Sequence, residues 1–402
     1  MKKIEFSPPD ITEKEISHVI DTLKSGWITT GNKVREFEQN ISYICQTKKT
    51  KCMNSATSCL EMVLRILDIQ EGDEVITTPY TYAATCNVIY HVGAKPVLVD
   101  IDENTLQMNY EKVFEAINKN TKVIIPVDLG GILCDYDKIF EILETKKGDF
   151  KPKNFLQEKI GRIVILADSS HSFGAYKQEK ISGMLADFTV FSFHAVKNLT
   201  CAEGGAVTWN LNKNISDDEI YQKLSLFSLH GQSVDAYSKA KLKKWEYDIL
   251  VPGFKCNMTD IHASIGLAQL ERIEEIYKMR KKIVKIYNEV LCDQNLKIFQ
   301  EDEKIDSSSC HLYIVNLVDK DENYRNKIMS SMSEKNIDTN IHYKPLPMFT
   351  VYKNKGFNIK NFPNAYKVYK NEITLPVHNL MNEEDAFYVA DNLKKILNEK
   401  YC

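Results

Sequence analysis

The chain has no apolar run approaching the roughly 18 residues that a membrane-spanning helix needs. Its first residues, Met-Lys-Lys-Ile-Glu-Phe, lack the apolar segment of a secretory signal peptide. The ten cysteines include no Cys-x-x-Cys pair. We therefore expect a cytoplasmic protein with reduced thiols, without a disulfide framework and without a membrane partner.

Signals of several other protein classes are missing as well. No His-Glu-x-x-His and no cysteine–histidine cluster with zinc spacing occurs, so the sequence predicts no metal site. The absence of Gly-x-Gly-x-x-Gly and of Gly-x-x-x-x-Gly-Lys-Ser/Thr disfavours a simple nucleotide-binding Rossmann enzyme. A net charge of −3 gives no electrostatic reason to expect nucleic acid as a partner.

What is present is typical of a folded α/β protein. Of the 402 residues, 43% are hydrophobic, and this length favours two domains over one. Short apolar segments alternate with helical ones from residue 73 to residue 209, which predicts a largely parallel sheet. The expected strands are 73–78, 95–100, 122–127, 163–168, 188–193 and 206–209.

The second half of the chain is expected to hold a smaller domain. Apolar residues at helical spacing predict one long helix over 261–288, leading into strand 310–317 and a final helix at 383–397. We place the large domain at residues 1–259 and the small α/β domain, with its bridging helix, at 260–402.

Three charged segments are interpreted as surface. Residues 146–159 form a polar, lysine-rich insertion, and residues 215–245 are expected to be helical. Basic clusters at 239–244 and 278–282 are most simply solvated helix faces.

A single lysine stands out between two predicted strands. Lys197 follows the apolar run 188–193, and Glu203-Gly-Gly205 leads into the next run. Connections held by a rigid sheet often carry chemistry, and partial desolvation there would lower the pKa of the amine and free it as a nucleophile. From this pattern alone, an ordinary solvated lysine is equally open.

Two other stretches could complete a site with Lys197. Ser55 to Thr57 stand directly before an amphipathic helix, where unpaired N–H groups bind anions, although a plain N-cap explains them too. Asp168 ends a buried strand, where a side chain points into the ligand crevice of a parallel sheet or caps a turn. A phosphate cradle, a buried carboxylate and a reactive amine are together what pyridoxal 5'-phosphate (PLP) requires.

The chain resembles the DegT/DnrJ/EryC1/StrS sugar-nucleotide aminotransferases of the fold-type I PLP class over nearly its whole length. The resemblance rests on the stretches 191–205, 54–57, 72–77, 168–175, 229–231, 252–260, 266–271 and 342–346. It implies a large PLP-binding domain with a mostly parallel central sheet and a smaller C-terminal α/β domain. Residues 25–31, 193–198 and 231–237 resemble the subgroup that aminates C4 of UDP-linked 4-keto sugars, such as the UDP-4-amino-4-deoxy-L-arabinose transaminase.

The resemblance assigns roles by position. Lys197 would form the Schiff base and then act as general acid and base. The remaining cofactor contacts would come from Asp168 at the pyridine nitrogen, His171 beside the ring, Tyr82 on its face, Ala56, Thr57 and Ser192 at the phosphate, and Asn257 of the partner subunit at the same phosphate. The sugar-nucleotide pocket would include Trp27, Thr30, His230, His342 and Tyr343.

The implied reaction transfers an amino group from L-glutamate to a nucleotide-linked keto sugar, through pyridoxamine phosphate, in a homodimer with shared active sites. Alternatives are amination at C3 of a dTDP-3-keto-6-deoxy sugar and a non-catalytic PLP-binding regulatory protein. Related dehydratases commonly replace the lysine with histidine, and Lys197 argues against that reaction.

The chain departs from the family pattern near the ring aspartate and just after the preceding strand. Ala167, Ser169 and Ser170 stand where glutamate and alanines are usual, and Asp128 stands where a histidine is frequent. These differences leave the identity of the sugar open.

Overall fold

The computed structural model describes residues 3–234, 237, 245–300 and 307–399, and within them the largest feature is a seven-stranded sheet. Its order is β1-β9-β8-β5-β4-β2-β3. The strands are β1 (Thr50–Met53), β2 (Glu74–Thr77), β3 (Lys95–Leu98), β4 (Thr121–Ile124), β5 (Val164–Asp168), β8 (Phe188–Ser192) and β9 (Gly205–Trp209).

The sheet is mostly parallel, as the sequence predicts. Strand β9 runs antiparallel to both of its neighbours, β1 and β8, while the pairings from β8 to β3 are parallel. One strand of this sheet was not predicted: β1 has only four residues, and Lys51 within it is buried against Glu38 at 3.2 Å. A short strand with a lysine in it carries no clear strand pattern.

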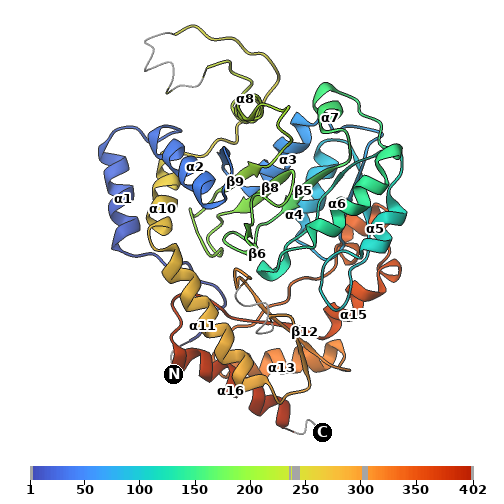
Figure 1. The fold of residues 1–402 in the computed structure, drawn as a ribbon. Helices are drawn as coiled ribbons and strands as arrows, with labels where there is room; N and C mark the ends of the chain where they lie inside the picture. Colours follow the sequence, from blue (N-terminus) through green and yellow to red (C-terminus); the bar gives the residue numbers. More distant parts are fainter. Residues whose placement is uncertain (1–2, 235–236, 238–244, 301–306, 400–402) are drawn as a thin grey trace.

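Helices cover the sheet on both faces (Figure 1). They are α1 (Glu13–Lys24), α2 (Asn32–Ile44), α3 (Ala56–Ile66), α4 (Ala83–His91), α5 (Tyr110–Ala116), α6 (Tyr136–Thr145), α7 (Phe155–Ile160), α8 (Asp217–Ser228) and α10 (Asp260–Leu270). Apolar side chains of the strands pack against α3 and α8 in one cluster and against α5 and α6 in another. A two-stranded ribbon joins β6 (Tyr176–Lys177) to β7 (Lys180–Ile181).

A second, antiparallel sheet lies at the other end of the molecule, where both chain termini are found (Figure 1). Its order is β10-β11-β12, from β10 (Leu296–Ile298), β11 (Tyr313–Leu317) and β12 (Glu372–Leu375). The helices of this half are α11 (Ile273–Leu291), α13 (Glu322–Glu334), α14 (Thr350–Asn354), α15 (Pro363–Asn371) and α16 (Glu383–Asn398). Short 3-10 turns lie at Leu129–Gly131, Lys147–Asp149, Leu346–Met348 and Ile359–Asn361.

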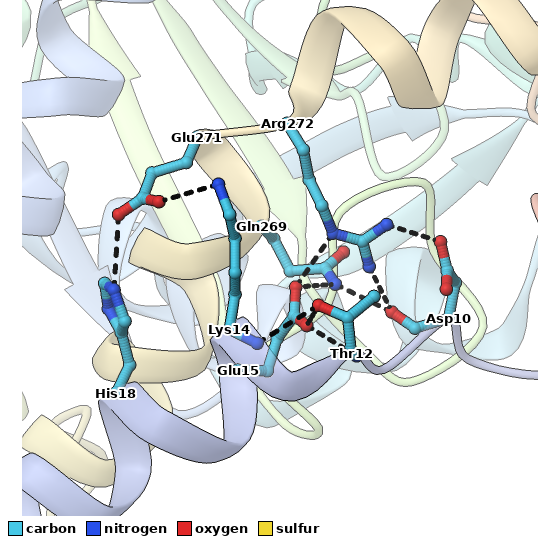
Figure 2. Close-up of polar contacts among 8 residues, drawn as sticks. All are labelled: Asp10, Thr12, Lys14, Glu15, His18, Gln269, Glu271 and Arg272. Atoms are coloured by element: carbon cyan, nitrogen blue, oxygen red, sulfur yellow. Dashed lines mark hydrogen bonds and ion pairs between the residues drawn. The ribbon is translucent and has the colours of Figure 1, made fainter.

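The prediction of one long helix over 261–288 is wrong. The segment forms two helices, α10 and α11, which are separated at Glu271 and Arg272. The segment contains neither glycine nor proline at that point, so the sequence gives no stop signal. Arg272 instead turns its guanidinium to the N-terminal segment, where it donates to Asp10 Oδ2 at 2.6 Å and Glu15 Oε1 at 3.0 Å (Figure 2). This network fixes the start of α1 against the joint between α10 and α11.

The division at residue 259 stays a prediction, and two observations bear on it. Helix α10 packs against α1 and α2, on the side of the large sheet. Ile4, near the start of the chain, belongs to the core of the second sheet and pairs with Ile337.

One prediction about the charged segments needs correction. Helix α8 ends at Ser228 rather than continuing to residue 245, because His230 and Gly231 take left-handed backbone angles and the chain reverses against Val251. The basic cluster at 239–244 lies outside the described residues. The insertion at 146–159 lies mostly at the surface, as predicted, and Gln157 anchors it, because this residue is buried and donates to the Leu67 carbonyl at 2.7 Å. In the described part of the chain, no helix is long and apolar enough to cross a membrane.

Candidate active site

One edge of the large sheet gathers most of the residues predicted to hold the cofactor. Asp168 and Ser192 end the parallel strands β5 and β8 at this edge. Because β9 is antiparallel, its first residue Gly205 lies beside Ser192, and Met53 at the end of β1 lies beside Gly205. The chain order of the strands thus brings the segment 54–57 to the same edge as Asp168.

Helix α3 begins directly over the start of β9. Ser55 is its N-cap and accepts a hydrogen bond from the Ser58 N–H at 3.1 Å, so the capping interpretation of this serine is correct. Ala56 and Thr57 form the first turn, whose N–H groups have no partner within a helix. A Cβ atom on Gly205 would lie 2.4 Å from the Ala56 nitrogen, so only glycine permits this close approach. The arrangement suits a phosphate group held by backbone N–H groups.

Asp168 is held in place by two hydroxyl donors. Thr85 Oγ1 donates to Oδ2 at 2.7 Å, and Ser170 Oγ donates to Oδ1 at 2.6 Å. The carboxylate is buried, with 6% of the residue exposed. Ser170 is one of the departures from the family pattern, and here it orients the aspartate.

His171 lies next to this aspartate and is buried as a neutral ring. Burial, followed by the positive charge of Lys197, lowers its pKa well below the ordinary value. The Gly130 N–H donates to Nδ1 at 3.2 Å, which leaves the ring proton on Nε2. Nε2 is 3.2 Å from the Tyr343 hydroxyl, so His171 donates to Tyr343 and leaves the phenolic proton available to the site.

Lys197 is half-buried on the turn after β8, where its backbone N–H donates to the His194 carbonyl. Burial lowers the pKa of its amine to about 8, against the opposing attraction of the Asp168 carboxylate. A larger fraction of this amine is therefore neutral at physiological pH than for an exposed lysine.

Two aromatic residues and a histidine border this group. Tyr82 is the N-cap of α4 and is 66% exposed, with its ring centroid 6.3 Å from that of Tyr343. His342 hydrogen-bonds Thr374 through Nδ1 at 3.0 Å, and burial together with Lys197 lowers its pKa to about 3. The structure thus places His342 and Tyr343, predicted for the sugar pocket, beside the predicted cofactor residues.

The other predicted pocket residues form a separate group. Thr30 accepts a hydrogen bond from Asn257 Nδ2 at 2.7 Å, and its carbonyl accepts one from Trp27 Nε1 at 3.1 Å. Thr30 and Asn257 line a cavity of about 920 Å³ that Lys197 does not reach. His230 is exposed on the neighbouring loop, where its N–H donates to the Phe254 carbonyl.

Several residues of the site were not expected from the sequence. Thr85 orients Asp168, and Asn198 and His311 bind each other beside Lys197 and His171. The only sequence signal for Asn198 is its place next to Lys197. Thr85 and His311 are far from the lysine in sequence, and nothing in their local pattern marks them.

The residues gathered at this edge of the sheet suit PLP. The first turn of α3 and Ser192 suit a phosphate, Asp168 suits a protonated pyridine nitrogen, and Lys197 supplies the amine for an aldehyde. When bound, PLP supplies an electron-accepting ring, while the chain holds and moves the protons.

Comparisons with known proteins agree with this geometry. The model of the DegT/DnrJ/EryC1/StrS aminotransferase family matches residues 9–394. The spore coat polysaccharide biosynthesis protein SpsC of Bacillus subtilis is 33% identical over 399 residues, covering 98% of this chain and 96% of that protein.

Solved structures give the same result. The sugar aminotransferase Spr1654 of Streptococcus pneumoniae, described as putative and solved in PLP and PMP forms, is 47% identical. Its PLP form has a TM-score of 0.94, covering 98% of this chain and 99% of that one. PseC of Helicobacter pylori, an aminotransferase involved in the biosynthesis of pseudoaminic acid, is 26% identical with a TM-score of 0.84, covering 98% and 99%. The chain therefore belongs to the DegT/DnrJ/EryC1/StrS family of PLP-dependent sugar aminotransferases.

Proposed function

We propose that this enzyme moves an amino group from L-glutamate to C4 of a UDP-linked 4-keto sugar, with Lys197 as its catalytic residue. The observation that carries the catalytic role is the joint placement of Lys197, Asp168 and the start of α3 at one edge of the sheet. Lys197 has the lowered amine pKa that proton transfer at neutral pH requires.

The acceptor is assigned from the resemblance of residues 25–31, 193–198 and 231–237 to the subgroup that aminates C4 of UDP-linked 4-keto sugars. The names of two relatives agree with a sugar acceptor: SpsC is named for spore coat polysaccharide biosynthesis, and PseC is described as involved in the biosynthesis of pseudoaminic acid. In this chain, Tyr343 presents a phenolic proton and His342 a neutral ring beside the cofactor residues, which suits hydrogen bonding to sugar hydroxyls.

The proposed active unit is a homodimer in which Asn257 of the partner subunit reaches the phosphate. Within one chain, the Asn257 side chain donates to Thr30 at the large cavity, whose lining does not include Lys197, and its backbone pairs with Met53 just before the start of α3. Exposed apolar side chains are numerous near this cavity and on α1, as expected for a surface that a second copy covers. They include Ile16, Ile20, Leu23, Trp245, Tyr247, Ile249 and Leu250. A cytoplasmic location stays a prediction.

The experiment is an isotope transfer with a panel of acceptors. Purified enzyme is incubated with ¹⁵N-labelled L-glutamate and, separately, with a UDP-4-keto pentose, a UDP-4-keto-6-deoxy hexose and a dTDP-3-keto-6-deoxy sugar. We expect labelled nitrogen on C4 of a UDP-linked sugar. Label on C3 of the dTDP sugar alone would replace this proposal with the alternative acceptor, and no transfer to any sugar would contradict it.

A further inference from the structure

One segment of the second half contacts both the Lys197 turn and the His171 turn. It comprises Ser309 to Leu312, which precede β11. Ser309 Oγ donates to the His171 carbonyl at 2.5 Å, and the Ser309 N–H donates to the Gly131 carbonyl at 3.2 Å. A Cβ on Gly131 would lie 2.1 Å from Ser309 Oγ, so these segments are as close as glycine allows.

Within this segment, His311 links the two turns through its side chain. Its Nδ1 lies 2.8 Å from Oδ1 of Asn198, the residue that follows Lys197. The Asn198 amide nitrogen donates to the Ser309 carbonyl at 2.7 Å, so its oxygen is left to accept. His311 Nδ1 must therefore be the donor, which fixes its tautomer. On its other side, the ring packs on His171 with centroids 4.4 Å apart.

Burial makes the hydrogen bond between His311 and Asn198 costly to break. His311 is 5% exposed and Asn198 is 8% exposed. Burial, then the neighbouring charges, lowers the pKa of His311 well below its ordinary value, so the ring stays neutral and keeps one donor and one acceptor. A buried polar group that loses its partner pays the full cost of desolvation.

We propose that His311 is a positioning residue: through its hydrogen bond to Asn198 it holds the Lys197 turn at a fixed separation from the His171 turn, against which its ring packs. The inference rests on the proposed catalytic role of Lys197. The alternative is a core histidine that only stabilises the fold.

Two substitutions at His311 test the role of its hydrogen-bond donor and the role of its aromatic ring separately. His311→Phe keeps the ring against His171 and removes the donor, while His311→Asn keeps an N–H near the position of Nδ1 and removes the ring. His378→Phe is the matched control, because His378 is also buried, at 4% exposure, and its Nε2 contacts the Glu5 carbonyl at 2.9 Å.

The main measurement is the pH titration of the visible absorbance of the PLP-loaded protein, with thermal unfolding alongside. We expect His311→Phe to raise the titration midpoint by at least about 0.5 pH unit, since a loosened lysine turn admits water and water stabilises the protonated nitrogen. His311→Asn should return the midpoint toward that of the wild type. The control should lower the melting temperature without moving the midpoint.

Kinetics provide the second readout. We expect kcat of His311→Phe to fall by about tenfold or more with a smaller change in the KM for glutamate, as for a group that orients reacting atoms. An unchanged midpoint and kcat would overturn the inference. So would equal defects in the Phe and Asn variants, because the donor would then have no role.

If His311→Phe does not fold, Asn198→Ala removes the same hydrogen bond from the other side and must shift the midpoint in the same direction. The titration uses no sugar, so it is independent of the acceptor assignment. Failure of the proposed role of Lys197 would appear separately, as a Lys197→Ala variant that keeps wild-type activity.

Discussion

The two ends of the proposed active site differ in how completely one chain builds them. At the Lys197 end, Asp168 has two hydroxyl donors and His171 has partners on both ring nitrogens. At the Asn257 end, the residues line an open cavity and are flanked by exposed apolar side chains. This difference is what the proposed homodimer predicts: one chain forms the chemical centre, and a second copy completes the outer part of the site.

The largest expected effect is at the Lys197 end. Replacing Lys197 with alanine should reduce transamination by at least about 10³-fold, because both the bond to the cofactor and the proton transfer depend on this amine. Steady-state assays with glutamate and a keto sugar measure the loss. Lys122→Ala, at a lysine that is 2% exposed and donates to the Lys119 carbonyl at 2.8 Å, is a matched control for removing a buried amine. A Lys197→Ala variant within tenfold of the wild type would contradict the assignment.

Hybrid dimers test whether the two ends come from different chains. Lys197→Ala and Asn257→Asp should each be inactive as homodimers, the second because it places a carboxylate at the phosphate. Mixed by unfolding and refolding together, they should regain about a quarter of wild-type activity, since half of the dimers are hybrids with one intact site. If both residues of one site come from the same chain, the mixture should remain inactive.

The pH dependence of PLP uptake tests the lowered pKa of Lys197. Burial lowers the pKa of Lys197 to about 8, so its neutral, reactive fraction falls about tenfold for each pH unit below that value. The rate at which PLP-free protein takes up PLP should rise with pH and level off near pH 8. Absorbance in a stopped-flow experiment measures this rate. A rise that continues to about pH 10 would mean an ordinary, solvated lysine.

Removing a hydroxyl donor to Asp168 should have a smaller effect than removing the Lys197 amine. Thr85→Val removes the 2.7 Å hydrogen bond to Oδ2 and keeps the shape of the side chain. A hydrogen bond to a charged group contributes about 1.5–3 kcal/mol, so PLP should dissociate roughly tenfold or more readily. Equilibrium dialysis of the loaded enzyme gives the affinity. Thr189→Val, a buried threonine on β8, provides the comparison and should retain PLP normally.

The smallest expected effect is at the start of α3. Ser55→Ala removes an N-cap, which costs about 0.5–2 kcal/mol of stability in urea unfolding. Thr259→Ala removes the corresponding cap of α10 and should cost a similar amount. We expect only Ser55→Ala to weaken phosphate binding by the PLP-free protein as well. Equal phosphate binding in both variants would contradict a cradle at α3.

The positions of Asp168 and Lys197 at the sheet edge could be predicted from the sequence because strand ends are local features. Asp168 and Lys197 follow apolar runs that are strands in the structure, and the parallel order of β5 and β8 brings their ends to one edge. The family match over residues 9–394 agrees with the resemblance found in the motifs.

The contacts between distant segments could not be predicted in the same way. Asn198 and His311 are 113 residues apart, and their pairing depends on how the second half packs against the first. Strand β1 and the end of α8 were missed for related reasons, since a buried ion pair and a left-handed turn, respectively, decide them. Local pattern predicts which residues can react, while tertiary packing decides what orients them.

The most direct test of the account follows the visible absorbance through one complete reaction cycle. PLP-loaded enzyme should lose its absorbance on addition of L-glutamate and regain it on addition of a UDP-4-keto sugar after glutamate is removed. Recovery with the sugar would show that this protein carries nitrogen from the amino acid to the sugar nucleotide. Bleaching by glutamate with no recovery by any nucleotide-linked keto sugar would contradict the proposed function.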